Sequence, residues 1–415
     1  MACLMPIECK FLGGGHEVGR LGILVKTGKA SLLFDYGMSA TDPPKYPDPA
    51  PAIDMMFLTH SHLDHCGMIP WATARHDVDV VATTTSKKVG GLLMEDSIKV
   101  AASEGYPEMY GKTEVKHALG RFRDVEFGDT VSAKSVQVRT HSAGHIPGAT
   151  MYEVMGEKTT LVTGDLHTLD TRLVGGAKPV KCDNLIMEST YSGRNHPDRL
   201  KTEYAFLKKV HEVVDRGGKA IVPAFAVGRT QEILLLLKDS KLDYWHDGMG
   251  KSVNKIYLEE PGHLRSAKRL RQAVSRGREV KNFQARQRAH DGEVIVTTSG
   301  MLDGGPVVSY IEGARTDPKS AILMTGYQVE GSNGRKLLDT GSMEFHGVVE
   351  KVECEVLKFD FSAHAGHDDL VAFAKGCSPE RIVLCHGDHR EALAEELRGD
   401  GFEVLLPMNG EKFEL

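Results

Sequence analysis

The stretch LTHSHLDHCG, residues 58–67, decides how the rest of the sequence is interpreted. It places three histidines and an aspartate within six residues: His60, His62, Asp64 and His65. Imidazole and carboxylate are side chains that bind zinc-type cations. A strand that ends at His60 and is followed by a turn would bring these side chains to one point. They exceed what one four-coordinate ion needs from one loop, so the stretch predicts two metals. A polar surface loop is the alternative, for which so dense a cluster is rare.

Three more ligand-type residues follow β-rich stretches further along the chain. His145 lies in HSAGHIPGA, Asp165 ends LVTGD and His386 ends IVLCH. Singly, each has an ordinary alternative, because a histidine at a strand end is often only a hydrogen-bonded loop residue. As a set, they complete two metal spheres. Asp35 in LLFDYG is predicted to hold an imidazole or the His60 loop, and its alternative is to cap backbone N–H groups in a turn.

The pattern of elements changes near residue 195. Residues 1–190 are predicted to form short strands joined by Gly-rich turns. After that, helices alternate with strands, which is typical of a parallel α/β layer. Within this layer NKIYLEE, residues 254–260, is predicted to be a strand. From about 359 the first pattern returns.

Composition limits the class of protein. A chain of 415 residues predicts two to three domains, or one domain interrupted by an insert. The net charge of −6 excludes a globally basic nucleic-acid coat protein, so a polyanion would have to meet a local patch. Seven scattered cysteines without a C-x-x-C pair favour a reducing compartment. No secretory signal and no long apolar run is found, so a soluble, cytoplasmic protein without a membrane partner is expected.

Such a patch is found in residues 265–290, which hold nine Lys and Arg against one Glu. Clustered cations of this kind bind phosphate backbones. The alternative is a solvated helix face whose counter-charges lie elsewhere. Arg229 and Arg335 each follow a Gly near a predicted helix start, where backbone N–H groups also bind anions. Both are predicted phosphate contacts, as is Ser299 in TTSGM, whose alternative is to make a turn.

With these residues in place, the sequence resembles a known family. HSHLDH, His145 and Asp165 match the signature motifs of the metallo-β-lactamase superfamily. Glu188 in MESTY, His364 in FSAHAG and His386 in LCHGDH resemble the three extra motifs of its β-CASP branch, the nucleic-acid-processing nucleases. The strings GGGHEVGR, PAFAVGRTQE, TTSGM and GYQVEGSNGRKLL are most similar to the nuclease subunit of the cleavage and polyadenylation specificity factor and its prokaryotic relatives. The resemblance covers essentially the whole chain.

The resemblance implies a fold and a domain plan. The fold would be α/β: an αββα metallo-β-lactamase sandwich interrupted by an α/β β-CASP domain with a parallel sheet. Residues 1–194 and 359–415 would form the metallo-β-lactamase domain, and residues 195–358 the β-CASP insert. Two departures stand out. Where the family usually has Gln in the first loop, this sequence has His16, to which no role is assigned. The KH-type RNA-binding domains that some archaeal relatives carry before these motifs are not found in this sequence.

The resemblance also implies the site. One zinc would be bound by His60, His62, His145 and Asp165, and the other by Asp64, His65, the bridging Asp165 and His386. His364, oriented by Glu188, would lie near the scissile phosphate. These two residues and Asp64 form the predicted catalytic set.

The expected activity is zinc-dependent hydrolysis of RNA phosphodiester bonds, as an endonuclease, a 5′–3′ exonuclease or both, in RNA processing or decay. In-line attack would leave 3′-hydroxyl and 5′-phosphate ends. Single-stranded RNA is the expected substrate, and RNA is favoured over DNA because RNA-directed relatives tend to carry His at the position of His386. A homodimer is expected because relatives often dimerise. One alternative is a lactam or thioester hydrolase, against which the large insert and its basic segment argue. A non-catalytic subunit of an RNA-processing complex is the other, but such relatives lose metal ligands and this chain keeps all seven.

Overall fold

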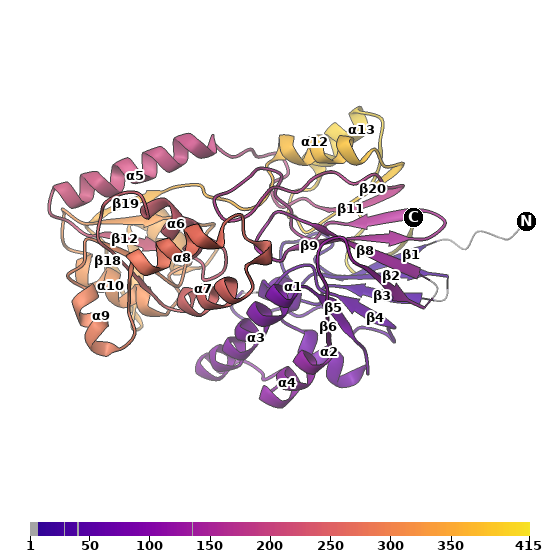
Figure 1. Ribbon diagram of the computed structural model, residues 1–415, viewed down its shortest axis with the longest axis horizontal. Coiled ribbons are helices and arrows are strands. Elements are labelled where there is room, and N and C mark those ends of the chain that lie inside the picture. The colour runs from indigo at the N-terminus through magenta and orange to yellow at the C-terminus, as the bar shows by residue number, and fades with distance from the viewer. Residues whose placement is uncertain (1–6, 29, 40, 135) are drawn as a thin grey trace, which may run out of the picture. The chain divides into compact units, whose positions relative to one another are not determined.

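The computed structural model describes residues 7–415 apart from 29, 40 and 135, and these residues fold into two compact units (Figure 1). Unit 1 is built from the described residues up to Asp170, from Gly175–Asn195 and from Ala363–Leu415. Unit 2 is built from Thr171–Val174 and His196–Ser362. The chain therefore leaves unit 1 to form unit 2 and then returns.

Unit 1 contains two seven-stranded sheets. The first sheet has, in spatial order, β22 (Lys412–Glu414), β1 (Glu8–Gly13), β2 (Gly22–Thr27), β3 (Ala30–Phe34), β4 (Met55–Phe57), β5 (Val80–Ala82) and β6 (Phe122–Asp124). The second has β21 (Glu403–Leu405), β20 (Arg381–Cys385), β11 (Asn184–Glu188), β10 (Thr159–Val162), β9 (Thr150–Met155), β8 (Val136–Ser142) and β7 (Thr130–Ala133). In each sheet antiparallel pairing gives way to parallel pairing, at β3–β4 and at β10–β11. The parallel part of each sheet supplies strand ends to the site.

The core of unit 1 lies between the sheets. The rings of Phe34 and Phe57 from the first sheet stack with centroids 5.1 Å apart, and Phe57 meets Tyr152 of the second sheet edge-on, also at 5.1 Å. Burying a side chain of this size stabilises a fold by about 1.5–3 kcal/mol. Strand β8 alternates buried and exposed residues because only one face is covered, whereas β20 is almost continuously buried.

Helices cover the two outer faces of this pair of sheets (Figure 1). On the first sheet lie α1 (Leu63–Cys66), α2 (Ile69–Arg75), α3 (Thr84–Glu104) and α4 (Lys112–Gly120), and on the second lie α12 (His367–Cys377) and α13 (Glu391–Gly399). The expected αββα sandwich is therefore confirmed. The expectation of only strands and turns in this region was wrong for α3. Its Thr, Ser and Gly content gives poor helix propensity, and the helix instead depends on the Thr83 cap and on packing of residues such as Val89 and Met94.

Unit 2 is a single six-stranded sheet in which all strands are parallel, as predicted. Its spatial order is β14 (Arg278–Glu279), β13 (Tyr244–Asp247), β15 (Val294–Thr297), β12 (Ala220–Pro223), β16 (Ala321–Met324) and β19 (Glu355–Lys358). A hairpin of β17 (Ser342–Phe345) and β18 (Val348–Lys351) stands apart from the sheet. The helices of unit 2 are α5 (Arg199–Asp215), α6 (Arg229–Leu237), α7 (Gly250–Glu259), α8 (Ala267–Arg276), α9 (Phe283–Ala289), α10 (Pro306–Ala314) and α11 (Asn333–Thr340), with a 3-10 turn at Pro261–His263.

One predicted strand of unit 2 was wrong. Residues 254–260 lie mostly in α7, and the strand of this region is β13. The buried positions of α7 have the spacing of one helix face, and burial of this face outweighs the strand preference of Ile and Tyr; they are Gly250, Val253, Asn254 and Tyr257. Nowhere in the described part of the chain is a helix both long enough and apolar enough to cross a membrane.

Candidate metal centre

All seven predicted metal ligands come together in unit 1. They follow strand ends or lie at the start of a short helix: His60 after β4, His62 at the N-cap of α1, Asp64 and His65 within α1, His145 between β8 and β9, Asp165 after β10, and His386 after β20. Both sheets therefore contribute. Strand ends position His60, His145, Asp165 and His386, and the short helix α1 positions the other three ligands.

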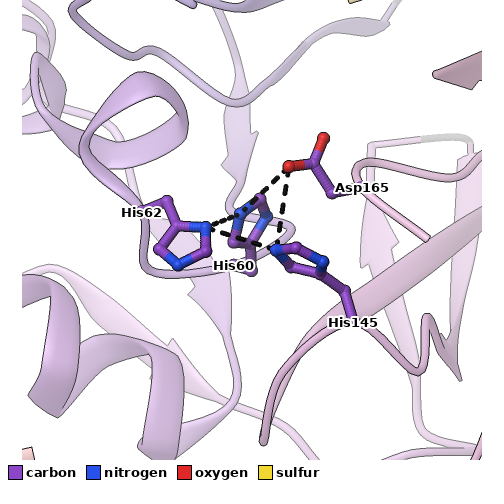
Figure 2. A group of neighbouring side chains, drawn as sticks. All are labelled: His60, His62, His145 and Asp165. Carbon is purple, nitrogen blue, oxygen red and sulfur yellow. Dashed lines mark hydrogen bonds and ion pairs between the residues drawn. The ribbon is translucent and has the colours of Figure 1, made fainter. Parts of the chain in front are cut away.

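The first group of ligand atoms contains three imidazoles and one carboxylate (Figure 2). His62 Nδ1 lies 3.0 Å from His60 Nε2 and 3.3 Å from His145 Nε2. Asp165 Oδ2 lies 3.6 Å from His60 Nε2 and 3.8 Å from His145 Nε2. All four ligand atoms are within 4.8 Å of one another, which suits a single four-coordinate cation.

The second group contains Asp64, His65 and His386, again with ligand atoms within 4.8 Å. Asp165 reaches this group with its other oxygen. Its Oδ1 lies 3.4 Å from His65 Nε2 and 3.1 Å from His386 Nδ1. The two oxygens of Asp165 thus point to two different groups, which is the geometry of a bridging ligand.

The second group also passes a test of fit to a cation. His65 Nε2, Asp165 Oδ1 and His386 Nδ1 are buried, yet none has a hydrogen-bond partner among the described residues. Burying a polar atom without a partner costs about 1–3 kcal/mol. Three such atoms facing one another are explained by a positive ion that they share.

Surrounding groups fix the orientation of the imidazoles. Asp35 accepts hydrogen bonds from the Thr59 backbone N–H and from His65 Nδ1, both at 2.7 Å, so both predicted roles of this carboxylate occur together. His145 Nδ1 donates to the Ala363 carbonyl at 2.7 Å. With the proton held on Nδ1, Nε2 of His65 and of His145 presents a lone pair to the metal position.

The ligand histidines fall into two electrostatic classes. Burial and neighbouring imidazoles lower the pKa of His60 and of His145 well below the usual range, and burial lowers the pKa of His62 to about 4. Burial also acts on His386, but the attraction of Asp165 outweighs it and raises its pKa to about 10. The pKa of His65 is raised in the same way, by Asp165 and Asp35 against burial. The histidines of the first group are therefore neutral at pH 7, whereas the raised pKa values of His65 and His386 favour the protonated form until a cation binds.

His364 differs from the ligands. Its Nδ1 donates to Glu188, with the two carboxylate oxygens at 3.0 and 3.1 Å, and its Nε2 lies 3.8 Å from Asp165 Oδ2. Glu188 also accepts from the Leu166 backbone N–H at 2.7 Å. The side chain of His364 is 20% exposed, whereas Asp165 and Glu188 are nearly inaccessible. Burial is outweighed by Glu188 and Asp165, so the pKa of His364 is raised.

Sequence reasoning missed one residue of this arrangement. His167 Nδ1 donates to the carbonyl of His364 at 3.0 Å, so it holds the backbone of the His364 loop. Its position two residues after Asp165 was the available signal, but a bond to a carbonyl far along the chain leaves no pattern in the sequence.

The three predicted phosphate contacts lie in unit 2. The buried Arg229 is the first residue of α6, and its guanidinium donates to the Thr325 carbonyl. Arg335 in α11 is exposed and pairs with Asp339 at 2.7 Å. Ser299 Oγ accepts from the Met301 N–H at 3.3 Å. Their roles stay predictions.

Comparison with known proteins places this geometry in a family. Family models match in three successive parts: the metallo-beta-lactamase superfamily at residues 19–206, the Beta-Casp domain at 230–337, and the Zn-dependent metallo-hydrolase RNA specificity domain at 349–407. The protein named Probable RNase MJ4 of Methanocaldococcus jannaschii is 37% identical over 99% of this chain and 100% of its own length. The chain belongs to the β-CASP family of the metallo-β-lactamase superfamily.

This β-CASP chain is also similar to RNase aCSPSF2 of Saccharolobus solfataricus, at 34% identity over 98% of this chain and 85% of the relative. The transcription termination factor FttA of Pyrococcus horikoshii is 31% identical over 92% of this chain and 66% of its own length. Among solved structures, a protein of unknown function from Enterococcus faecalis V583 matches with a TM-score of 0.66 at 14% identity, covering 99% of this chain and 100% of its own. At that identity the likeness concerns the fold alone.

Proposed function

We propose that this chain is a zinc-dependent ribonuclease that hydrolyses RNA phosphodiester bonds and holds two zinc ions. Asp165 carries the proposal, since it offers one oxygen to each of two groups of buried ligands. Two zinc ions bound there would supply the Lewis acidity that makes water nucleophilic at neutral pH and that neutralises charge on a phosphate. Support for RNA comes from the relatives named as ribonucleases and from the RNA specificity model at residues 349–407.

The two zinc positions would be filled by the two groups. His60, His62, His145 and Asp165 would hold the first ion, and Asp64, His65, Asp165 and His386 the second. Asp64 is also the most exposed ligand of its group, which places it where the water and the substrate would arrive. The proposed domains follow the same plan: residues 1–194 and 359–415 supply the metal centre, and residues 195–358 form the β-CASP insert.

His364 would protonate the leaving oxygen. In-line attack by water on phosphorus breaks the bond to the 3′ oxygen, which then needs a proton. His364 Nε2 faces Asp165, and its Nδ1 is held by Glu188, so the ring can deliver a proton from Nε2 without turning. The products would be 3′-hydroxyl and 5′-phosphate ends.

The substrate would be single-stranded RNA. Most ligand side chains of both groups are almost completely buried, and Asp64, His62 and His364 are the partly exposed residues of the site. A scissile phosphate must therefore approach these three residues closely, which a flexible single strand does more easily than a duplex. Arg229, Ser299 and Arg335 are kept as candidate phosphate contacts. We also propose the homodimer that the family resemblance suggests, which light scattering at several concentrations would test.

The decisive experiment uses 5′-labelled linear RNA and the same RNA closed into a circle, each with and without chelator. We expect zinc-loaded protein to cleave linear RNA and chelator to stop it. Cleavage of the circle would assign endonuclease action, and its survival beside stepwise loss from the 5′ end of the linear form would assign exonuclease action. Full cleavage in excess chelator, with metal loss confirmed, would refute the proposal.

A further inference from the structure

Unit 2 carries a strongly basic segment that the proposed chemistry does not use. Residues 265–290 hold nine Lys and Arg against one Glu, in a chain whose net charge is −6. Some of these cations already have partners in the fold. Arg286 pairs with the buried Asp247 at 2.7 Å, Arg278 with Asp243 at 2.7 Å, and Arg269 with Asp239 at 3.4 Å.

The remaining cations include four that face solvent without an acid. Lys268 and Arg271 on α8, Lys281 before α9 and Arg288 within α9 are exposed, and no described acidic side chain forms an ion pair with them. Lys268 and Arg271 are three residues apart and so share one face of α8. The buried positions of that helix are Leu270 and Ala273. The positive charge is thus directed outward.

Helix α9 adds an aromatic side chain to this charge. Its buried positions, Ala285 and Ala289, are four residues apart and define its inner face. Its exposed residues are Phe283, Gln284, Gln287 and Arg288, whose spacing gives one outer face. Phe283 is 73% exposed. This outer face has one aromatic ring, two amides and a guanidinium, and it has no acid.

We propose that Lys281, Phe283, Gln284, Gln287 and Arg288, here called the α9 surface, bind single-stranded RNA, and none of these residues of unit 2 is a proposed metal ligand. The choice of RNA rests on the proposed ribonuclease function. Bases would stack on Phe283, and phosphates would contact Lys281 and Arg288. Stacking is tolerant of sequence because every base has a π-face, and exposed cations follow the backbone charge.

A protein partner fits this surface less well. Stable protein interfaces bury about 800 Å² on each side and are depleted in Lys at their centre. One phenylalanine among amides and cations does not supply such a centre. Duplex RNA fits less well too, because its bases are already stacked and do not reach an exposed ring.

The test measures the affinity of the full chain for a fluorescent 20-nucleotide oligouridylate over a range of salt, in chelator so that the RNA stays intact. Phe283→Ala should weaken binding by about 5- to 100-fold with an unchanged salt slope, because stacking releases no counterions. Phe283→Trp should retain binding. The double variant Lys281→Ala/Arg288→Ala should weaken binding and reduce the salt slope by about 1.4, because each phosphate of a single strand that is no longer neutralised lowers the slope by roughly 0.7.

Matched controls lie in the same unit. Leu200 on α5 is also 73% exposed, so Leu200→Ala removes an equally exposed apolar side chain. Lys208→Ala/Lys255→Ala removes two exposed charges from other helices. Both controls should bind RNA like the parent. Equal losses in the controls, or no loss in the α9 variants, would overturn the proposal, as would equally strong displacement of the RNA by polyglutamate.

This outcome can be separated from failure of the ribonuclease proposal. Cleavage by zinc-loaded parent is measured in parallel on the same RNA. Absence of cleavage together with loss of binding in the α9 variants would refute the nuclease and leave the RNA surface standing. Normal cleavage with unaltered binding in those variants would refute only the surface.

Discussion

The side chain of His386 lies among the proposed metal ligands and is only 1% exposed. The side chain of His364 is 20% exposed and is hydrogen-bonded to Glu188. We expect His386→Ala to lose part of its zinc and nearly all activity, because one ligand group then lacks an imidazole. We expect His364→Ala to keep its zinc and its RNA affinity while the cleavage rate falls by about two to four orders of magnitude, the usual contribution of a general acid. Zinc content, RNA affinity and single-turnover rate on both variants decide between these roles.

A matched control for His364 lies elsewhere in unit 1. His141 on β8 pairs with Glu153 at 2.8 Å, the same kind of pair outside the ligand groups. His141→Ala should keep both zinc content and cleavage rate. Zinc loss in His364→Ala, or normal cleavage with full zinc in His386→Ala, would show that the roles of metal ligand and proton donor are wrongly assigned to these two histidines.

The two classes of ligand histidine predict different pH dependence for the two zinc ions. A ligand that holds a proton must lose it to bind zinc, so affinity rises with pH until the pKa is passed. The pKa of His386 is raised to about 10, and that of His65 is also raised. Each proton that the second ion displaces should therefore weaken its binding by about tenfold for every unit that the pH falls below 8. The first ion should be almost insensitive between pH 6.5 and 8, since the pKa values of its histidines are lowered, that of His62 to about 4.

Calorimetric titration with zinc in two buffers of different ionisation enthalpy measures the protons released. The expected result is little release for the first ion and clear release for the second. Equal release for both ions at pH 7.5 would contradict the division into two classes.

At the scale of elements, α1 owes its position to backbone contacts with the segment after β3. Tyr36 N–H donates to the His65 carbonyl at 2.8 Å, and Gly37 packs so closely that an added Cβ would lie 1.7 Å from the Asp64 carbonyl oxygen. Gly37→Ala must therefore displace α1, and we expect a loss of stability of about 1–3 kcal/mol with weaker binding of the second zinc.

Gly120→Ala serves as the control for this substitution. No atom lies within 4 Å of a Cβ at Gly120, the last residue of α4, so stability and zinc binding should be unchanged. Thermal unfolding and zinc titration of both variants provide the measurement. A Gly37→Ala protein that binds two zinc ions as tightly as the parent would refute the proposed dependence on α1.

How far the sequence predicts these elements depends on how local their causes are. The cluster from His60 to His65 could be recognised because its ligands lie within six residues. His145, Asp165 and His386 could be recognised because each follows a stretch with the pattern of a strand. Helix α3 and strand β13 could not be recognised from the sequence, because tertiary packing overrides local propensity in both segments. The bond from His167 to His364 depends on two loops meeting in space.

At the scale of the whole molecule, every proposed zinc ligand lies in unit 1 and none in unit 2 among the described residues. A ligand that binds only the folded state stabilises it, by about 2.7 kcal/mol at a free concentration 100 times Kd. We expect zinc to slow amide hydrogen exchange in β4, β10, β11 and β20, with little change in β12, β15 and β16. Mass spectrometry of peptides with and without zinc measures this. Equal protection of both sets of strands would contradict it.

The position of β20 between β11 and β21 has a consequence for the order in which a nascent chain can fold. Roughly 190 residues, including nearly all of unit 2, separate Glu188 at the end of β11 from Arg381 at the start of β20. At about 5–20 residues per second, translation takes about 10–40 s to cross that distance. Throughout this interval β11 has an unpaired edge and His386 does not yet exist. Unit 2 can therefore complete its sheet on the ribosome while unit 1 stays open, and the proposed second zinc could be loaded only after β20 has joined β11.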